Sequence, residues 1–273
     1  MIAPVSSNPQ PIGEPGTSWE WESSPWFSQW RAGVGQTTLV CLPHAGAGSS
    51  AYSRWVPLLP PWIHLVTATL PGRESRFHEP LITSVEEVIQ ALGPTLADRA
   101  REPFALFGHS LGALLAYELS HWLEDHSALG PDLLILSGRV APHHGRSAAH
   151  LHSLSDAEFL AAMHERYGRI PDLLRDSPEL QRIFLPAMRG DMEMLEHYRV
   201  RQPARSLSSD LLVLGASNDP TTSESGLQAW SDLTLGRTTL RTLPTGQHFF
   251  AQTQAREVTQ IIVDALVTRL TAW

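Results

Sequence analysis

The chain has 273 residues, 42% of them hydrophobic, and a net charge of −8 at pH 7. This length can bury the core of one large α/β domain, and the acidic balance argues against nucleic acid as a partner. The single cysteine, Cys41, excludes an internal disulfide framework. The first residues lack the pattern of a secretory signal, and no apolar run is long enough to cross a membrane. We therefore expect a cytoplasmic protein without membrane contact.

The first 24 residues are rich in proline, serine and glycine, so we expect a mobile N-terminal arm at 1–24 and one domain over 25–273. Large aromatic residues lie within and just after this arm, and such side chains seldom remain in water. They are Trp19, Trp21, Trp26, Phe27 and Trp30. We expect them to hold the arm against the body of the protein; a docking surface for a partner is the alternative.

Short apolar runs then alternate with amphipathic helical patterns. The predicted strands cover 37–42, 65–70, 104–107, 133–137, 211–215 and 238–243. The predicted helices among them cover 84–101, 113–119 and 258–270. This alternation predicts an α/β fold with a mostly parallel, doubly wound sheet, whose functional loops lie at the carboxyl ends of the strands.

The alternation stops between about 145 and 205. Two helical patterns follow one another there, at 156–167 and 178–198. An all-helical insertion between two strands would lie over the strand ends, so we predict a lid. Its methionines could line an adaptable pocket or belong to an ordinary core. They are Met188, Met192 and Met194.

One stretch combines a strand, a sharp turn and a helix. The strand at 104–107 leads into Gly-His-Ser-Leu-Gly at 108–112, and the helical pattern follows at once. Gly-x-Ser-x-Gly in this context predicts a nucleophile elbow, whose strained turn lifts the hydroxyl of Ser110 clear of the sheet. A surface Gly/Ser turn is the alternative, and the presence of a base and an acid decides between the two.

A serine nucleophile needs a base, which is usually a histidine. Of the 13 histidines, His248 is the one that follows a late strand and precedes a helix. Asp219 lies just beyond the carboxyl end of the strand before, which predicts it as the acid. Asp210 begins that strand, at its wrong end, and Asp232 lies on the helix beyond. The chain order Ser110, Asp219, His248 is the order expected for an α/β-hydrolase.

Two backbone N–H groups are predicted to hold the oxyanion of the reaction. One belongs to Leu111, directly after the serine. The other belongs to the small-residue loop that follows the first strand, where Ala45 is the first choice and Gly46 the second.

A second group of histidines precedes the predicted lid. It consists of His143, His144, His150 and His152. Zinc is conceivable at such a group, but no cysteine or carboxylate at metal-binding spacing supports it. We predict neither a metal nor any other cofactor.

Six separated motifs agree in order and spacing with those of one family. They are LPHAG at 42–46, LPGRE at 70–74, GHSLG at 108–112, LSGR at 136–139 with Ala141-Pro142, LPAMRGD at 185–191 and GQHFF at 246–250. With these motifs the chain resembles the type II thioesterases, the free-standing editing enzymes of polyketide and nonribosomal peptide synthesis. The resemblance runs from about Ser24 to the C-terminus. Gln247 departs from it, since glycine is more usual there, and residues 1–23 lie outside it.

The resemblance implies an acyl thioester on the phosphopantetheine arm of an acyl or peptidyl carrier protein as substrate. It implies that Ser110, His248 and Asp219 hydrolyse it without a cofactor, and we expect a monomer. Related thioesterases fused to synthetases carry their acid after the strand that follows the elbow helix. Here that place reads Ser-Gly-Arg at 137–139, without a carboxylate, which favours the free-standing type.

The residues by themselves indicate only a serine hydrolase. A carboxylesterase or acyltransferase acting on oxygen esters is therefore one alternative, and a non-catalytic binding protein is another. Carrier proteins are generally acidic, as is this chain, so docking would need a local basic patch. The candidates follow strand ends on the site side of the sheet, and they are Arg73, Arg76, Arg139 and Arg146.

Overall fold

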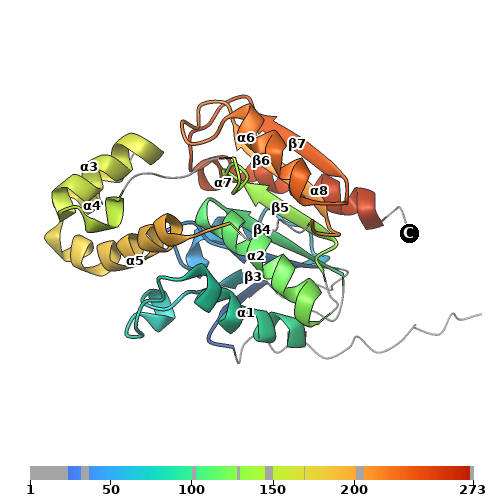
Figure 1. The fold of residues 1–273 in the computed structure, drawn as a ribbon, viewed down its shortest axis with the longest axis horizontal. Coiled ribbons are helices and arrows are strands. Elements are labelled where there is room, and N and C mark those ends of the chain that lie inside the picture. The colour runs from blue at the N-terminus through green and yellow to red at the C-terminus, as the bar shows by residue number, and fades with distance from the viewer. Residues whose placement is uncertain are drawn as a thin grey trace, which may run out of the picture.

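Seven strands of the described chain form one sheet in the order β1-β3-β2-β4-β5-β6-β7 (Figure 1). The computed structural model describes residues 24–31, 37–99, 103–127, 130–144, 150–168, 170–200 and 206–270. The strands are β1 (Phe27–Arg31), β2 (Thr37–Leu42), β3 (Ile63–Ala68), β4 (Phe104–His109), β5 (Leu133–Ser137), β6 (Asp210–Ala216) and β7 (Thr238–Leu243). β1 runs antiparallel to β3, and all other neighbours run parallel. The prediction of a mostly parallel α/β sheet is confirmed.

The central strands β3, β2, β4 and β5 are buried at every position. A parallel sheet with helices on both faces has no solvent side, so its strands read as continuous apolar runs rather than alternating ones. For this reason the runs at 37–42 and 133–137 predict their strands with the bounds observed. The edge strand β7 is mostly half-buried or exposed, and the prediction at 238–243 also has the observed bounds. The strand predicted at 65–70 is displaced, because β3 covers 63–68.

Helices cover both faces of the sheet. They are η2 (Ser49–Trp55), η3 (Glu74–Arg76), α1 (Val85–Arg99), α2 (Leu111–His126), α6 (Glu224–Gln228), η5 (Ala229–Leu233), α7 (Phe250–Thr253) and α8 (Ala255–Leu270). α1 and α2 belong to the core on one face through Leu92 and Leu114, whereas η2 and α8 belong to the other through Trp55 and Ile262. No helix in the described residues is both long and apolar enough to cross a membrane.

The edge strand β1 was not predicted. Phe27, which begins it, is buried and pairs with Ala68 of β3. The guanidinium of Arg76 lies 3.8 Å from the ring centre of Trp26, just before the strand. The aromatic residues around this point therefore attach an additional strand to the sheet. Trp19, Trp21 and residues 1–23 of the arm predicted at 1–24 lie outside the described residues.

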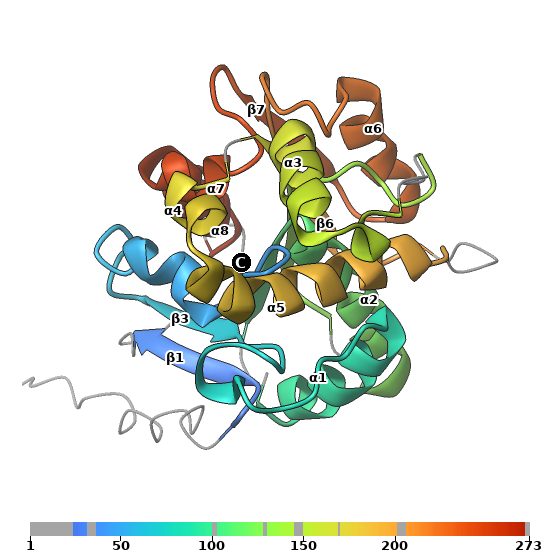
Figure 2. The ribbon, with the colours of Figure 1, turned by 90° about the vertical axis from the view of Figure 1, so that its left-hand side faces the viewer.

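The described residues between β5 and β6 form four helices, and we call residues 150–200 the helical insertion. They are η4 (Leu151–Ser153), α3 (Asp156–Tyr167), α4 (Asp172–Asp176) and α5 (Pro178–His197). Figure 2 shows α3, α4 and α5 facing the viewer in front of the sheet. The insertion has a small core of its own, to which Met188 and Met192 belong, while Met194 packs into the main core beside α1 and α2.

Candidate active site

Ser110 occupies the sharp turn between β4 and α2. Its backbone φ of 56° and ψ of −112° are strained for a residue with a side chain. A Cβ atom on Gly108 would lie 2.0 Å from the carbonyl oxygen of Gly112, and one on Gly112 would lie 2.0 Å from that of Leu42. Both positions therefore require glycine, and the turn has the geometry of the predicted elbow.

The side chains of Ser110, His248 and Asp219 form one buried chain of hydrogen bonds. Ser110 Oγ lies 2.9 Å from His248 Nε2, and His248 Nδ1 lies 2.9 Å from Asp219 Oδ2. Asp219 follows β6 and His248 follows β7, so both reach Ser110 from the carboxyl edge of the sheet. Because a carboxylate only accepts, Nδ1 carries the proton and Nε2 is free to accept from the serine hydroxyl.

Thr221 holds the far side of the Asp219 carboxylate and was not predicted. Its backbone N–H and its hydroxyl donate to Asp219 Oδ1 over 2.9 and 2.7 Å. Burial alone would raise the pKa of Asp219. The hydrogen bond and charge of His248, together with the two bonds from Thr221, outweigh it and lower the pKa. The sequence signal was available, because Asp-x-Thr after a strand favours a side-chain turn of this kind.

His109 lies next to the serine in sequence but does not contact its hydroxyl. Its Nε2 lies 2.8 Å from the carbonyl oxygen of His248, and its Nδ1 lies 2.9 Å from Ser137 Oγ. Burial, followed by the charges of His248 and His44, lowers the pKa of His109 well below its usual value. The ring is therefore neutral, with Nε2 donating to the carbonyl and Nδ1 accepting from the hydroxyl of Ser137. His109 thus fixes the backbone of His248.

The two predicted oxyanion donors lie beside the elbow. Leu111 begins α2, and Ala45 lies in the loop after β2. This loop packs against the first turn of α2, since a Cβ on Gly112 would lie 2.8 Å from the carbonyl oxygen of Pro43. Within the described residues, neither the Leu111 nor the Ala45 N–H has an acceptor. The N–H of Gly46, the second choice, donates to the carboxylate of Asp191 over 2.7 Å.

His44 precedes the oxyanion loop and is a neutral, packed imidazole. Its Nδ1 accepts from Gln252 over 3.3 Å, and its ring meets Phe249 edge to face. Desolvation, followed by the positive charges of His248 and Arg73, lowers the pKa of His44 to about 4.

We expect this half-buried histidine to make the fold sensitive to acid. An unfolded histidine takes a proton near pH 6.5, so the unfolded state binds more protons than the folded state between pH 6.5 and about 4. Stability is therefore full above pH 6.5 and is lost as the pH falls towards 4, by up to about 3 kcal/mol from this residue. Denaturant unfolding at pH 8 and pH 4.5 should show a smaller loss for His44→Asn than for the unaltered chain. Equal losses would contradict the assignment.

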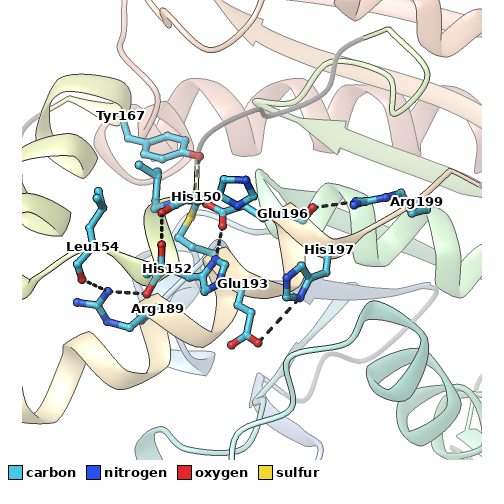
Figure 3. A network of polar contacts seen from close by, with 12 residues as sticks. His150, His152, Leu154, Tyr167, Arg189, Glu193, Glu196, His197 and Arg199 are labelled. Carbon is cyan, nitrogen blue, oxygen red and sulfur yellow. Dashed lines mark hydrogen bonds and ion pairs between the residues drawn. The ribbon is translucent and has the colours of Figure 1, made fainter.

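The histidine group formed by His143, His144, His150 and His152 is not assembled as a unit. His143 lies 3.4 Å from Asp232, whereas His150 and His152 lie near Glu196 of α5 (Figure 3). The ligand atoms of these last three residues lie within 4.8 Å of one another. Both oxygens of Glu196 already accept hydrogen bonds, one from His152 and one, over 2.6 Å, from the N–H of the residue between the histidines. This network ties η4 to α5.

The basic docking patch predicted from the sequence is wrong for two of its residues. Arg73 is 6% exposed and pairs with Asp191, and Arg76 is 7% exposed and bonds to Glu79 and to the carbonyl of Thr69. The side chain of Arg139 is also held in the protein, where burial lowers its pKa, and its Nε has no hydrogen-bond partner in the described chain. Arg73 and Arg76 therefore cannot form a surface patch. Arg146 lies outside the described residues.

The sheet order, the strained serine after β4 and the hydrogen-bonded chain at the strand ends define the class of the α/β-hydrolases. The family described as thioesterase domain matches residues 37–266. The thioesterase PikA5 of Streptomyces venezuelae is 35% identical to the chain and matches 85% of it and 82% of its own length. The chain belongs to the thioesterase domain family and is a hydrolase that acts on thioesters.

Two solved structures of type II thioesterases are similar to this one. BorB from the borrelidin biosynthetic cluster is 34% identical with a TM-score of 0.81, and the match covers 89% of this chain and 98% of that one. YbtT from the yersiniabactin NRPS/PKS pathway is 31% identical with a TM-score of 0.78, covering 88% and 97%. The resemblance that the sequence motifs indicated is thereby confirmed.

Proposed function

We propose that this chain is a type II thioesterase that frees acyl groups from the phosphopantetheine arm of acyl or peptidyl carrier proteins. Ser110 is the nucleophile, His248 the base and Asp219 the acid, and the Leu111 and Ala45 N–H groups form the oxyanion hole. The observation that carries the proposal is the buried chain from Asp219 through His248 to Ser110, next to two amides that have no acceptor among the described residues.

The first half of the reaction transfers the acyl group to the enzyme. Ser110 Oγ attacks the thioester carbonyl while His248 Nε2 takes the hydroxyl proton. The carbonyl oxygen becomes an anion that the two amides stabilise. When the C–S bond breaks, His248 returns the proton to the departing thiol of the phosphopantetheine arm. Asp219 holds the proton on Nδ1 and stabilises the imidazolium that forms in between.

The second half releases the acid. A water molecule gives a proton to His248 Nε2 and attacks the acyl-serine carbonyl. The same amides stabilise the second oxyanion, and its collapse returns the proton to Ser110 Oγ and frees a carboxylic acid. Every proton is moved by a side chain of this protein, so the proposed cycle uses no cofactor.

Several observations support carrier-bound substrates and action inside the cell. BorB, a type II thioesterase from the borrelidin biosynthetic cluster, and YbtT, one from the yersiniabactin NRPS/PKS pathway, match 89% and 88% of this chain. Cys41 is a buried free thiol, which is usual for a reducing compartment. We further propose that the enzyme acts in the cytoplasm as a monomer.

A panel of matched acyl donors tests this function. One acyl group is presented on a carrier protein, on a short pantetheine thiol and on an oxygen analogue of that thiol, each at several chain lengths. We expect kcat/KM to be highest for the carrier thioester and lowest for the oxygen ester. A preference for the oxygen ester would indicate an esterase. Equal rates for the carrier and the short thioester would remove the carrier protein from the proposal.

We also propose that the helical insertion acts as a lid over Ser110, and that α3 and α4 are its moving part. They rest on the insertion's small core, whereas Asp191 bonds α5 to the body of the protein. Because regions with few buried contacts open more readily, amides of α3 and α4 should exchange hydrogen faster than those of β4 and β5. Hydrogen exchange read by mass spectrometry measures this. Uniform protection of the helices and the strands would argue against a lid.

A further inference from the structure

Helix α5 of the insertion reaches the loop that carries Ala45. The carboxylate of Asp191 is fully buried, and its Oδ2 accepts the N–H of Gly46 over 2.7 Å. Met188, one turn earlier, packs on the same glycine, because a Cβ there would lie 2.3 Å from Met188 Cγ. Gly46 itself has a φ of 78°, which favours glycine. One face of α5 therefore lies directly on the peptide group next to the predicted oxyanion donor.

Arg73, from the segment after β3, completes this contact. It binds both oxygens of Asp191, over 2.6 and 2.8 Å, and donates to the carbonyl oxygen of Ala47 over 3.2 Å. The buried pair thus holds the loop by the N–H of Gly46 and by the carbonyl one residue later. Buried ion pairs often stabilise a fold no better than apolar residues of similar size would. The stability of the fold alone is therefore a weak reason for placing a pair here.

A second carboxylate holds the other end of the same loop. Glu74, next to Arg73, accepts the N–H groups of Ser49 and Ser50 over 2.8 and 3.0 Å. The consecutive amides at the start of η2 and the amide of Gly46 are thus occupied by the protein's own carboxylates. The N–H of Ala45 has no such acceptor among the described residues.

We propose that Asp191 is a positioning residue of the oxyanion hole. Asp191 fixes the Gly46 amide and pairs with Arg73. It thereby orients the adjoining peptide plane, between His44 and Ala45, so that the Ala45 N–H faces the carbonyl that reacts with Ser110. Asp191 acts through the loop and touches no reacting atom. The inference rests on the proposed function, since it assumes that Ser110 and Ala45 have the roles given above.

Two double variants isolate the contact with Gly46 from the buried charge. Arg73→Gln with Asp191→Asn removes both charges and retains an amide oxygen that can accept from Gly46. Arg73→Gln with Asp191→Leu is equally uncharged and of similar size, but offers the Gly46 N–H no acceptor. The two proteins differ only at residue 191. Each is assayed with a short acyl thioester and with an acyl trifluoromethyl ketone, whose carbonyl adds Ser110 Oγ and forms an oxyanion in the same hole.

The leucine variant should have a kcat about 10- to 100-fold below that of the asparagine variant, with KM changed less than about twofold. Its affinity for the ketone should fall by the same factor as kcat/KM, because both depend on stabilising an oxyanion. The pH profile should be the same in both, since His248 is untouched. A merely structural role would not produce this matched loss. Equal kcat and equal ketone affinity in the two variants would overturn the inference.

Two further measurements keep this result interpretable. If Ser110→Ala retains turnover and does not bind the ketone, the proposed function is wrong. If Ser110→Ala is inactive but the two double variants behave alike, only the positioning role of Asp191 is wrong. Should the leucine variant not fold, hydrogen exchange of the Gly46 amide in the unaltered protein, labelled with 15N-glycine, decides. An exchange rate as slow as that of β2 supports the contact, and the rate of an exposed loop overturns it.

Discussion

Replacing Ser110 by alanine is expected to lower the turnover of an acyl thioester by about four to six orders of magnitude. The hydroxyl that receives the acyl group is lost, while the oxyanion amides and the acyl site stay. Turnover of the purified variant, and labelling of both proteins by a fluorophosphonate, measure the effect. Ser127→Ala, at the other end of α2, is the matched control and should be nearly as active as the unaltered chain.

Thermal unfolding of the alanine variant distinguishes lost chemistry from lost structure. The strained φ at Ser110 persists in alanine, so the unfolding temperature should change little. A folded variant with turnover within tenfold of the unaltered enzyme would exclude Ser110 as the nucleophile.

Replacing Asp219 by asparagine is expected to lower turnover by about a thousandfold to ten-thousandfold. The reason lies in Thr221, whose two donors hold Oδ1 and so would hold the amide oxygen of the asparagine. The NH2 group then faces His248 Nδ1 and donates to it. The proton of the imidazole moves to Nε2, which can no longer accept from Ser110.

Two other aspartates serve as controls for this prediction. Asp210 pairs with Arg269 at the start of β6, and Asp232 lies on the surface near His143. Asn variants at these positions should change turnover by less than about threefold. If either were as damaging as Asp219→Asn, the assignment of the acid would be wrong. Kinetics with the same short thioester provide the comparison.

Local pattern and strand order were sufficient to predict the elbow. Gly108, Ser110 and Gly112 are adjacent in sequence, and their steric needs are local. Asp219 and His248 are distant in sequence, yet in a parallel sheet all loops after strands meet at one edge. The structure brings these residues together because strand order alone brings their loops to one place.

Contacts that depend on side-chain direction could not be predicted in this way. Arg73 was interpreted as a surface residue, because nothing local shows that it meets a carboxylate 118 residues later. The strand that begins at Phe27 was missed because its aromatic residues are interrupted by polar ones and follow a proline-rich stretch. The role of His109 in holding His248 likewise depends on the ring direction at a strained turn.

Capture of the acyl-enzyme tests the central claim most directly. The enzyme is mixed in excess with an acyl-carrier thioester, quenched with acid within milliseconds, digested and analysed by mass spectrometry. The account predicts that the mass of the acyl group appears on the peptide containing Ser110, disappears as free acid forms, and is never seen in Ser110→Ala. An acyl group on another residue, or full turnover with no adduct at Ser110 at any time, would contradict it.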